Sequence, residues 1–155
     1  MISKGKSKRS LKILVLAGGI SHEREVSLKS GRRVADALLD VGSTVVIREP
    51  DDKLLSNIKK DKPDVIWPCL HGASGEDGAL RDVLSLTGVP FVGATASAAR
   101  LAWDKSIAKV LVARAGILTP PSITLPKETF RELDAESVLK AVTSSIALPV
   151  VVKPA

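Results

Sequence analysis

The sequence has few aromatic residues and a single cysteine. Aromatic residues make up 3% of the chain and tyrosine is absent, so the core must be built from Val, Leu, Ile and Ala. At 155 residues, 45% of them hydrophobic, the chain can bury one ordinary core but not two. The lone Cys69 excludes an internal disulfide framework and fits a reducing compartment.

Long hydrophobic runs are also missing. No stretch approaches the roughly 20 apolar residues that span a bilayer. The apolar run before Gly18 and Gly19 is about seven residues long and precedes no small-residue cleavage pattern, so it makes a poor secretory signal. We therefore expect a cytoplasmic protein with no membrane partner.

Positive charge is concentrated at the start of the chain. The net charge is +6, yet residues 1–12 contain Lys4, Lys6, Lys8, Arg9 and Lys12 with no acidic residue, which leaves the remainder nearly neutral. Such a tail is usually disordered. A nucleic-acid or membrane arm is the alternative, but no aromatic residues interleave with the charges to stack on bases. We expect a disordered tail over residues 1–10 and no nucleic-acid partner.

Short apolar runs alternate with stretches of helical spacing. Strands are expected at residues 12–17, 44–47 and 65–67, an extended segment at 90–92, and helices near 26–41, 53–60, 77–86, 97–101 and 104–115. Alternation of this kind predicts an α/β fold with a doubly wound parallel sheet and right-handed crossovers.

Pro120 and Pro121 interrupt the pattern and predict a domain boundary. We expect an amino-terminal domain over residues 11–118, followed by a linker and an incomplete second domain over 119–155. Its expected elements are a strand after Ser122, a helix near 127–142 and a strand at 150–152. About 34 residues do not form an independent core, so the sequence looks interrupted.

Two polar loops follow strands of the predicted sheet, where open α/β sheets bind ligands. The first, residues 18–27, combines two glycines with the expected start of a helix, which favours close approach of an anion or polar ligand. Glu23 either interacts with the helix dipole or points into a cleft and holds an ammonium group. The second loop, residues 69–78, places His71 at a strand end, where it is either a hydrogen-bonded loop histidine or a site residue.

Other chemistries are less favoured at these loops. A Cys69–His71 nucleophile has no evident third partner, and His22, Cys69 and His71 lack the paired spacing of metal ligands, so no metal site is expected. Lys105 in the first turn of a helix opposes the helix dipole, and Lys153 closes an apolar run. Each is either an ordinary solvated lysine or a cation that binds phosphate.

Four segments together resemble the D-alanine:D-alanine ligase family of ATP-grasp enzymes. They occur in the family's order and spacing: LAGGISHEREVSLKSG at 16–31, HGASGEDGALRDVLSLTGVPFVGA at 71–94, DKSIAKVLVARAGILTPP at 104–121 and LPVVVKPA at 148–155. The HG-x-x-GEDG phrase is highly specific. The resemblance implies a pre-ATP-grasp, Rossmann-like amino-terminal domain followed by the first elements of an ATP-grasp domain.

The resemblance also implies a reaction and its site. The family uses ATP and Mg²⁺ to phosphorylate one D-alanine, and the amine of a second attacks the acyl phosphate to give a dipeptide for peptidoglycan. By similarity, Glu23 would bind the ammonium of the first D-alanine near Val26 and Ser27, and His71 would lie beside its carboxylate. The ATP phosphates would contact two lysines, Lys105 and Lys153.

Some features depart from the family pattern. Phe91, Trp103 and Arg81-Asp82 stand where Tyr, Met and Gln-Gly are usual, which indicates a divergent member. The Mg²⁺ ligands and most of the ATP clamp are expected beyond Ala155, so this chain alone is expected to be inactive. A homodimer through the amino-terminal domain is implied. The alternatives are a ligase joining D-alanine to D-lactate or D-serine, and a non-catalytic binding or dimerisation module.

Overall fold

The computed structural model describes residues 10–153. The basic tail predicted at residues 1–10 lies outside this range except for Ser10. The chain divides into two compact units, Met1–Arg100 and Leu101–Ala155. The domain boundary expected at residues 118–119 stays a prediction, because compactness alone does not show which part folds independently.

The first unit is built on a parallel sheet. Its strands are β1 (Lys12–Leu16), β2 (Thr44–Arg48) and β3 (Val65–Pro68), in the order β2-β1-β3. Leu14 of β1 is aligned with Val46 on one side and Ile66 on the other. Beyond β3, Phe91 forms an isolated parallel bridge with Ile66, as the expected extended segment predicts. The central position of β1 explains its continuous apolar sequence.

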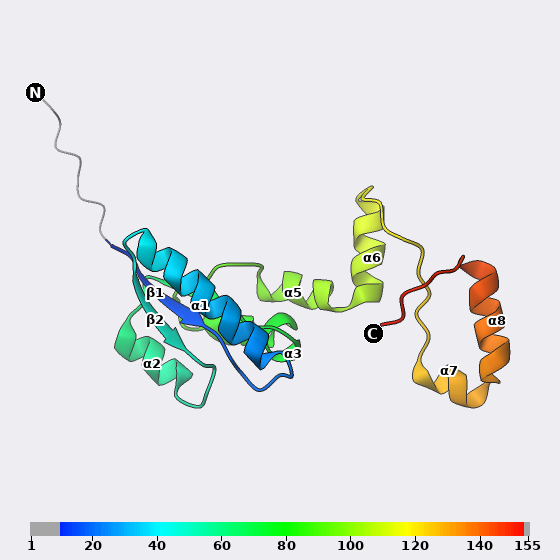
Figure 1. Cartoon of the computed structure of the whole chain (residues 1–155), viewed down its shortest axis with the longest axis horizontal. Helices are drawn as coiled ribbons and strands as arrows, with labels where there is room; N and C mark the ends of the chain where they lie inside the picture. Colours follow the sequence, from blue (N-terminus) through cyan, green and yellow to red (C-terminus); the bar gives the residue numbers. More distant parts are fainter. Residues whose placement is uncertain (1–9, 154–155) are drawn as a thin grey trace, which may run out of the picture. The chain divides into compact units, whose positions relative to one another are not determined.

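Helices cover both faces of the sheet (Figure 1). They are α1 (Arg24–Asp40), α2 (Leu54–Asp61) and α4 (Ala79–Ser85). Side chains of β1 alternate between two cores: Leu14 and Leu16 pack with α2 and α4, while Ile13, Val15 and Ala17 pack with α1. The predicted doubly wound α/β sheet is confirmed.

The helix predicted over residues 77–86 is present as α4, with slightly shorter ends, but the sequence did not predict the short helix before it. A short helix, α3 (Ala73–Glu76), precedes α4, and Gly78 between them has φ +90°. A Cβ at Gly78 would collide with the carbonyl oxygen of Ala96. The turn between α3 and α4 therefore depends on a close backbone approach from a distant segment, which helical spacing does not reveal.

The second unit consists of helices and irregular segments. The division after Arg100 falls within the helix α5 (Ala96–Trp103), and the second unit contains α6 (Lys105–Arg114), α7 (Lys127–Glu132) and α8 (Ala135–Ser145). The helix predicted at 127–142 is thus broken, because Asp134 caps α8 by accepting a hydrogen bond from Ser137 N–H at 2.8 Å. Among residues 10–153, no helix is long and apolar enough to cross a membrane.

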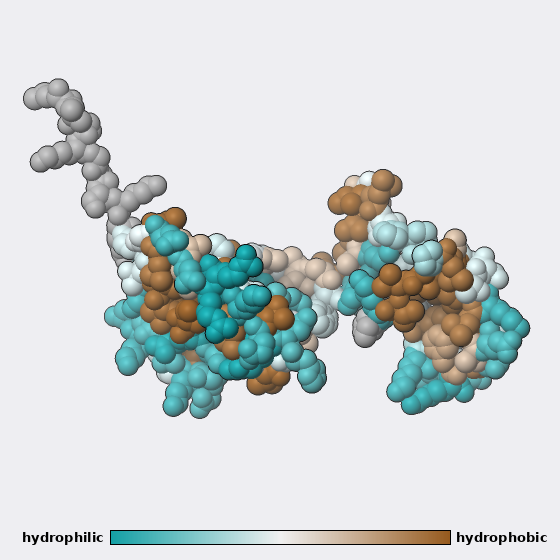
Figure 2. Space-filling view, viewed as in Figure 1, coloured by the Kyte–Doolittle hydropathy of each residue, from teal (hydrophilic) through white to brown (hydrophobic). Residues whose placement is uncertain are grey.

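The strands predicted after Ser122 and at 150–152 are absent from the described part of the chain, so these two predictions are wrong. Val151 is 82% exposed and Val152 is 89% exposed. A strand needs a neighbouring strand for its backbone hydrogen bonds, and residues 101–153 contain no strand at all. Figure 2 shows hydrophobic side chains on the visible face of this unit. Among its described residues, Val138 is the one hydrophobic residue that is buried.

Candidate functional site

A glycine loop, residues 18–23, connects the carboxyl end of β1 to α1. Gly18 N–H donates a hydrogen bond to Ser27 Oγ at 2.7 Å, and the Ser27 hydroxyl donates to the carbonyl of Cys69 at 2.8 Å. Ser27 is fully buried. Its hydroxyl therefore connects the ends of β1 and β3. The substrate contact that the family resemblance implies for Ser27 stays a prediction.

Glu23 lies at the start of α1 with an exposed side chain. It occupies the N-cap position but makes no side-chain capping hydrogen bond. Its carboxylate forms no hydrogen bond or ion pair with any other residue of the described range 10–153. A Cβ on Gly72 would lie 3.1 Å from Glu23 Oε2, so the carboxylate is directed toward the second loop. Capping does not account for this orientation.

His71 lies on that second loop, immediately after β3. Its backbone carbonyl accepts a hydrogen bond from Ser21 Oγ at 2.8 Å, which joins the two loops. The ring has a polar neighbour on each side: Nε2 is in hydrogen-bond distance of Ser30 Oγ at 3.2 Å, and Nδ1 lies 3.7 Å from Glu76 Oε1. The structure therefore brings the loops of Glu23 and His71 together at the carboxyl edge of the sheet, while their catalytic and binding roles stay predictions.

The remaining predicted site residues are exposed. Val26 is 53% exposed on α1. Lys105 follows Asp104, which caps α6 and whose pKa is lowered chiefly by its hydrogen bond to Ser106. The Lys105 ammonium lies 5.6 Å from the ring centre of Trp103. Lys153 follows the residues expected to form a strand at 150–152, but this segment is irregular and exposed, so burial does not require an anion beside its ammonium.

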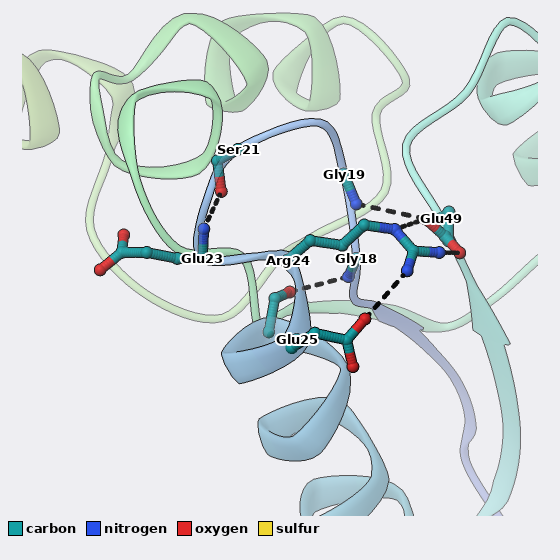
Figure 3. Close-up of polar contacts among 8 residues, drawn as sticks. Gly18, Gly19, Ser21, Glu23, Arg24, Glu25 and Glu49 are labelled. Atoms are coloured by element: carbon teal, nitrogen blue, oxygen red, sulfur yellow. Dashed lines mark hydrogen bonds and ion pairs between the residues drawn. The ribbon is translucent and has the colours of Figure 1, made fainter.

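Sequence reasoning missed an ion pair beside the glycine loop. Glu49, directly after β2, accepts hydrogen bonds from Arg24 and from Gly19 N–H (Figure 3). The two side chains help to line an open cavity of about 600 Å³, together with Gly19, Ile20, Ile47, Arg48, Pro50, Asp51 and Asn57. The position of Glu49 directly after a strand could have indicated this contact, because the carboxyl ends of parallel strands meet at one sheet edge.

Cys69 is buried next to this site. Burial raises the pKa of its thiol, which disfavours the thiolate needed for nucleophilic attack. Its carbonyl, rather than its sulfur, takes part in the network through Ser27. The structure thus adds a physical reason against the Cys–His nucleophile.

The fold and site define a class: an open parallel α/β domain with glycine-containing, polar loops at the carboxyl edge of its sheet. No family model matches the chain. It is 40% identical over 143 residues to a D-alanine–D-alanine ligase of Pelagibacter ubique, covering 92% of this chain. It is also 40% identical over 144 residues to D-alanine–D-alanine ligase B of Pseudomonas putida, covering 93% of this chain. The predicted resemblance to the amino-terminal part of a D-alanine–D-alanine ligase is confirmed.

Solved structures agree with this result. A D-alanine–D-alanine ligase from Bacillus anthracis matches with TM-score 0.68 and 29% identity, over 84% of this chain and 42% of that one. The VanG D-Ala:D-Ser ligase from Enterococcus faecalis matches with TM-score 0.64 and 26% identity, over 91% of this chain and 51% of that one. A Bacillus anthracis ligase complexed with ATP shares the fold at 23% identity, TM-score 0.64, over 88% of this chain and 56% of that one.

The chain spans under half the length of the curated relatives it matches, 46% of the Pelagibacter protein and 43% of the Pseudomonas protein. The matched share of this chain is more than residues 11–118 alone could supply. The likeness therefore extends into the segment expected to begin the ATP-grasp domain.

Proposed function

We propose that this chain supplies the first-substrate side of an ATP-dependent D-alanine:D-alanine ligase. Joining two D-alanines needs a site that binds the ammonium of the first and leaves its carboxylate open to phosphorylation. The resulting dipeptide would serve peptidoglycan synthesis, and the protein would act in the cytoplasm.

One observation carries the proposal: the exposed Glu23 carboxylate has no partner in the described range and faces the loop of His71. An amino acid has a cationic and an anionic end a few ångströms apart. Glu23 would bind the ammonium through charge-assisted hydrogen bonds, and His71, oriented by its contact with Ser30, would lie beside the carboxylate. Because Ser21 joins the two loops, the spacing of both groups would be set before substrate binds.

ATP fits the cations of the second unit. Lys105 and Lys153 are exposed and form no ion pair with a residue in the range 10–153, which leaves both ammonium groups accessible to phosphate oxygens, although that of Lys105 also lies 5.6 Å from the Trp103 ring centre. ATP supplies the phosphoryl group that activates a carboxylate. Mg²⁺ does not fit the described residues, which contain no group of three His, Cys, Asp or Glu side chains able to hold a metal ion.

A chimeric enzyme tests the proposal. Residues 11–153 would replace the matching segment of the Pelagibacter ligase, and D-alanine-dependent ADP formation would be measured together with the dipeptide. We expect activity, and Glu23→Gln should then raise the KM for the first D-alanine about 10- to 150-fold, the range expected for losing a charged hydrogen bond.

Glu25→Gln is the matched control, because Glu25 is the neighbouring acidic residue on the same helix and lies 3.3 Å from Arg24 rather than near His71. Its KM for D-alanine should stay within about twofold of the parent value. A Glu23→Gln chimera with an unchanged KM, or a well-folded parent chimera without activity, would contradict the proposed function.

A neighbouring specificity is the second candidate, favoured by the match to the VanG D-Ala:D-Ser ligase. In the same assay, mass spectrometry distinguishes D-alanyl-D-alanine from the products in which D-alanine is joined to D-serine or D-lactate. The non-catalytic module remains the alternative from another class. Its hallmark would be a stable homodimer through the amino-terminal domain that forms without supporting ligation in the chimera.

A further inference from the structure

Glu49 links β2 to the glycine loop. Its Oε2 accepts hydrogen bonds from Gly19 N–H and from Arg24 Nε, each at 3.3 Å, and its Oε1 accepts from Arg24 Nη2 at 2.5 Å. Contact at two points between a guanidinium and a carboxylate fixes direction as well as distance. The Glu49 carboxylate thus contacts both the backbone of the loop that precedes Glu23 and the side chain of Arg24, which directly follows Glu23.

Gly18 allows this carboxylate to come close to the loop. Its φ is +101°, and a Cβ at this position would collide with the Glu49 side chain. From the other direction, Ser27 accepts the hydrogen bond of Gly18 N–H. The first half of the glycine loop is therefore held between Glu49 at the end of β2 and Ser27 within α1.

The Glu23 carboxylate lies on the opposite side of the loop. Figure 3 shows the Glu23 side chain pointing to one side of the loop, while the Arg24 side chain points to the other side, toward Glu49. The backbone N–H of Arg24 donates to the Ser21 carbonyl at 3.1 Å, so the residue that pairs with Glu49 also closes the turn that contains Glu23. A shift of Arg24 would rotate this turn and move the Glu23 side chain relative to His71.

We propose that Glu49 is a positioning residue for the first-substrate site, which it controls by fixing the glycine loop and Arg24 and so setting the direction of Glu23. The role of Glu23 in binding the first D-alanine is taken from the proposed function. Glu49 itself does not touch substrate. The ion pair is half exposed, with side chains 43% and 42% accessible, so its contribution to folding stability is small. Its effect should therefore be found in loop position and substrate affinity.

Amide hydrogen exchange on the 155-residue chain tests the loop directly. Glu49→Gln keeps the side-chain shape but removes the charge that pairs with Arg24. We expect exchange at Gly19 N–H to become about 3- to 10-fold faster, with an almost unchanged melting temperature. Glu25→Gln is the matched control: it removes the other carboxylate on Arg24, 3.3 Å away, but leaves the Gly19 contact intact.

Kinetics of the active chimera test the site. Glu49→Gln should raise the KM for the first D-alanine about 3- to 10-fold with kcat within about twofold, because a displaced Glu23 weakens binding more than the chemical step. Glu49→Asp keeps the charge and should restore part of the affinity. In an Arg24→Gln background, Glu49→Gln should add little, because the two residues act as one unit.

Unchanged Gly19 exchange in Glu49→Gln would overturn the proposal. So would a KM equal to that of Glu25→Gln despite faster exchange, since Glu49 would then hold the loop without affecting the site. An inactive parent chimera would instead count against the proposed function. The exchange comparison would then decide by itself whether Glu49 holds the loop.

Discussion

Gly18 illustrates how a single residue depends on its neighbour across the sheet edge. Its positive φ is rare for residues with a side chain, and the Glu49 carboxylate fills the space where a Cβ would stand. Gly42 has a similar φ of +84°, yet a Cβ there would meet nothing within 4 Å. The two positions therefore separate the cost of backbone strain from the cost of collision.

We predict that Gly18→Ala destabilises the fold by more than Gly42→Ala. Gly42→Ala should cost about 1–2 kcal/mol from strain alone, and Gly18→Ala should cost more because Glu49 must also move. Urea denaturation of both variants measures the difference. Adding Glu49→Ala to Gly18→Ala should remove the excess, and equal losses in the two single variants would show that the collision is avoided by a small rearrangement.

A second residue-scale prediction concerns Asp61, whose Oδ2 accepts a hydrogen bond from Arg48 Nε at 2.6 Å. This hydrogen bond lowers the pKa of the Asp61 carboxyl. A lowered folded-state pKa means that the stabilisation is present above the unfolded pKa, near 4, and is lost as the pH falls through the folded value. The melting temperatures of the parent and Asp61→Asn should differ at pH 7 and converge toward pH 2. A constant difference across this range would contradict the assignment.

At the scale of elements, Ser27 connects three of them through one buried hydroxyl: it lies on α1, accepts from Gly18 after β1 and donates to Cys69 after β3. Ser27→Ala should cost about 1–3 kcal/mol, because a backbone donor and acceptor lose their buried partner. Ser56→Ala is the control, since the exposed Ser56 hydroxyl donates to Lys53 within one helix turn. Equal unfolding free energies for the two variants would refute the structural role of Ser27.

Arg81, Asp82 and Phe91, which the sequence analysis named as departures from the family pattern, each contact another part of the first unit. The Arg81 guanidinium lies 6.0 Å from the centre of the Phe91 ring and donates to the Ala94 carbonyl at 3.2 Å. Asp82 forms an ion pair with Arg100. A phenyl ring offers its face to a cation without needing a hydrogen-bond partner of its own, which fits Phe in place of Tyr beside Arg81.

Local patterns predicted the central elements well, because a strand such as β1, buried on both faces, is apolar throughout and α1 has a clear helical stripe. Features set by distant contacts escaped prediction. The turn at Gly78, between α3 and α4, lies against the Ala96 carbonyl, and the valines at 150–152 form no strand because a strand is defined by its neighbour. Glu49 directly follows a predicted strand, but its contact with Gly19 forms only at the folded sheet edge, so the ion pair itself was missed.

At the scale of the whole molecule, the two units differ in how much apolar surface they bury. The first has a core on each face of its sheet, whereas Leu101–Ala155 buries Val138 and leaves many large hydrophobic side chains exposed among its described residues. Exposed apolar surface of this extent is unusual for a monomeric soluble protein. The cations proposed to bind ATP, Lys105 and Lys153, both lie in this second unit.

We therefore predict that the 155-residue chain by itself forms no D-alanyl-D-alanine. Phosphoryl transfer requires several fixed groups around the charge that develops on the phosphoryl oxygens. Residues 10–153 offer two exposed lysines for this purpose and no metal-binding cluster, and stabilisation by so few groups falls short of the 8–23 kcal/mol or so that enzymes typically supply. Dipeptide and phosphate would be measured by mass spectrometry and a coupled assay on chain purified from a host lacking active ligase, with the active chimera as positive control. Equal amounts of dipeptide and phosphate above the chain-free background would show that the described residues already contain a complete catalytic site.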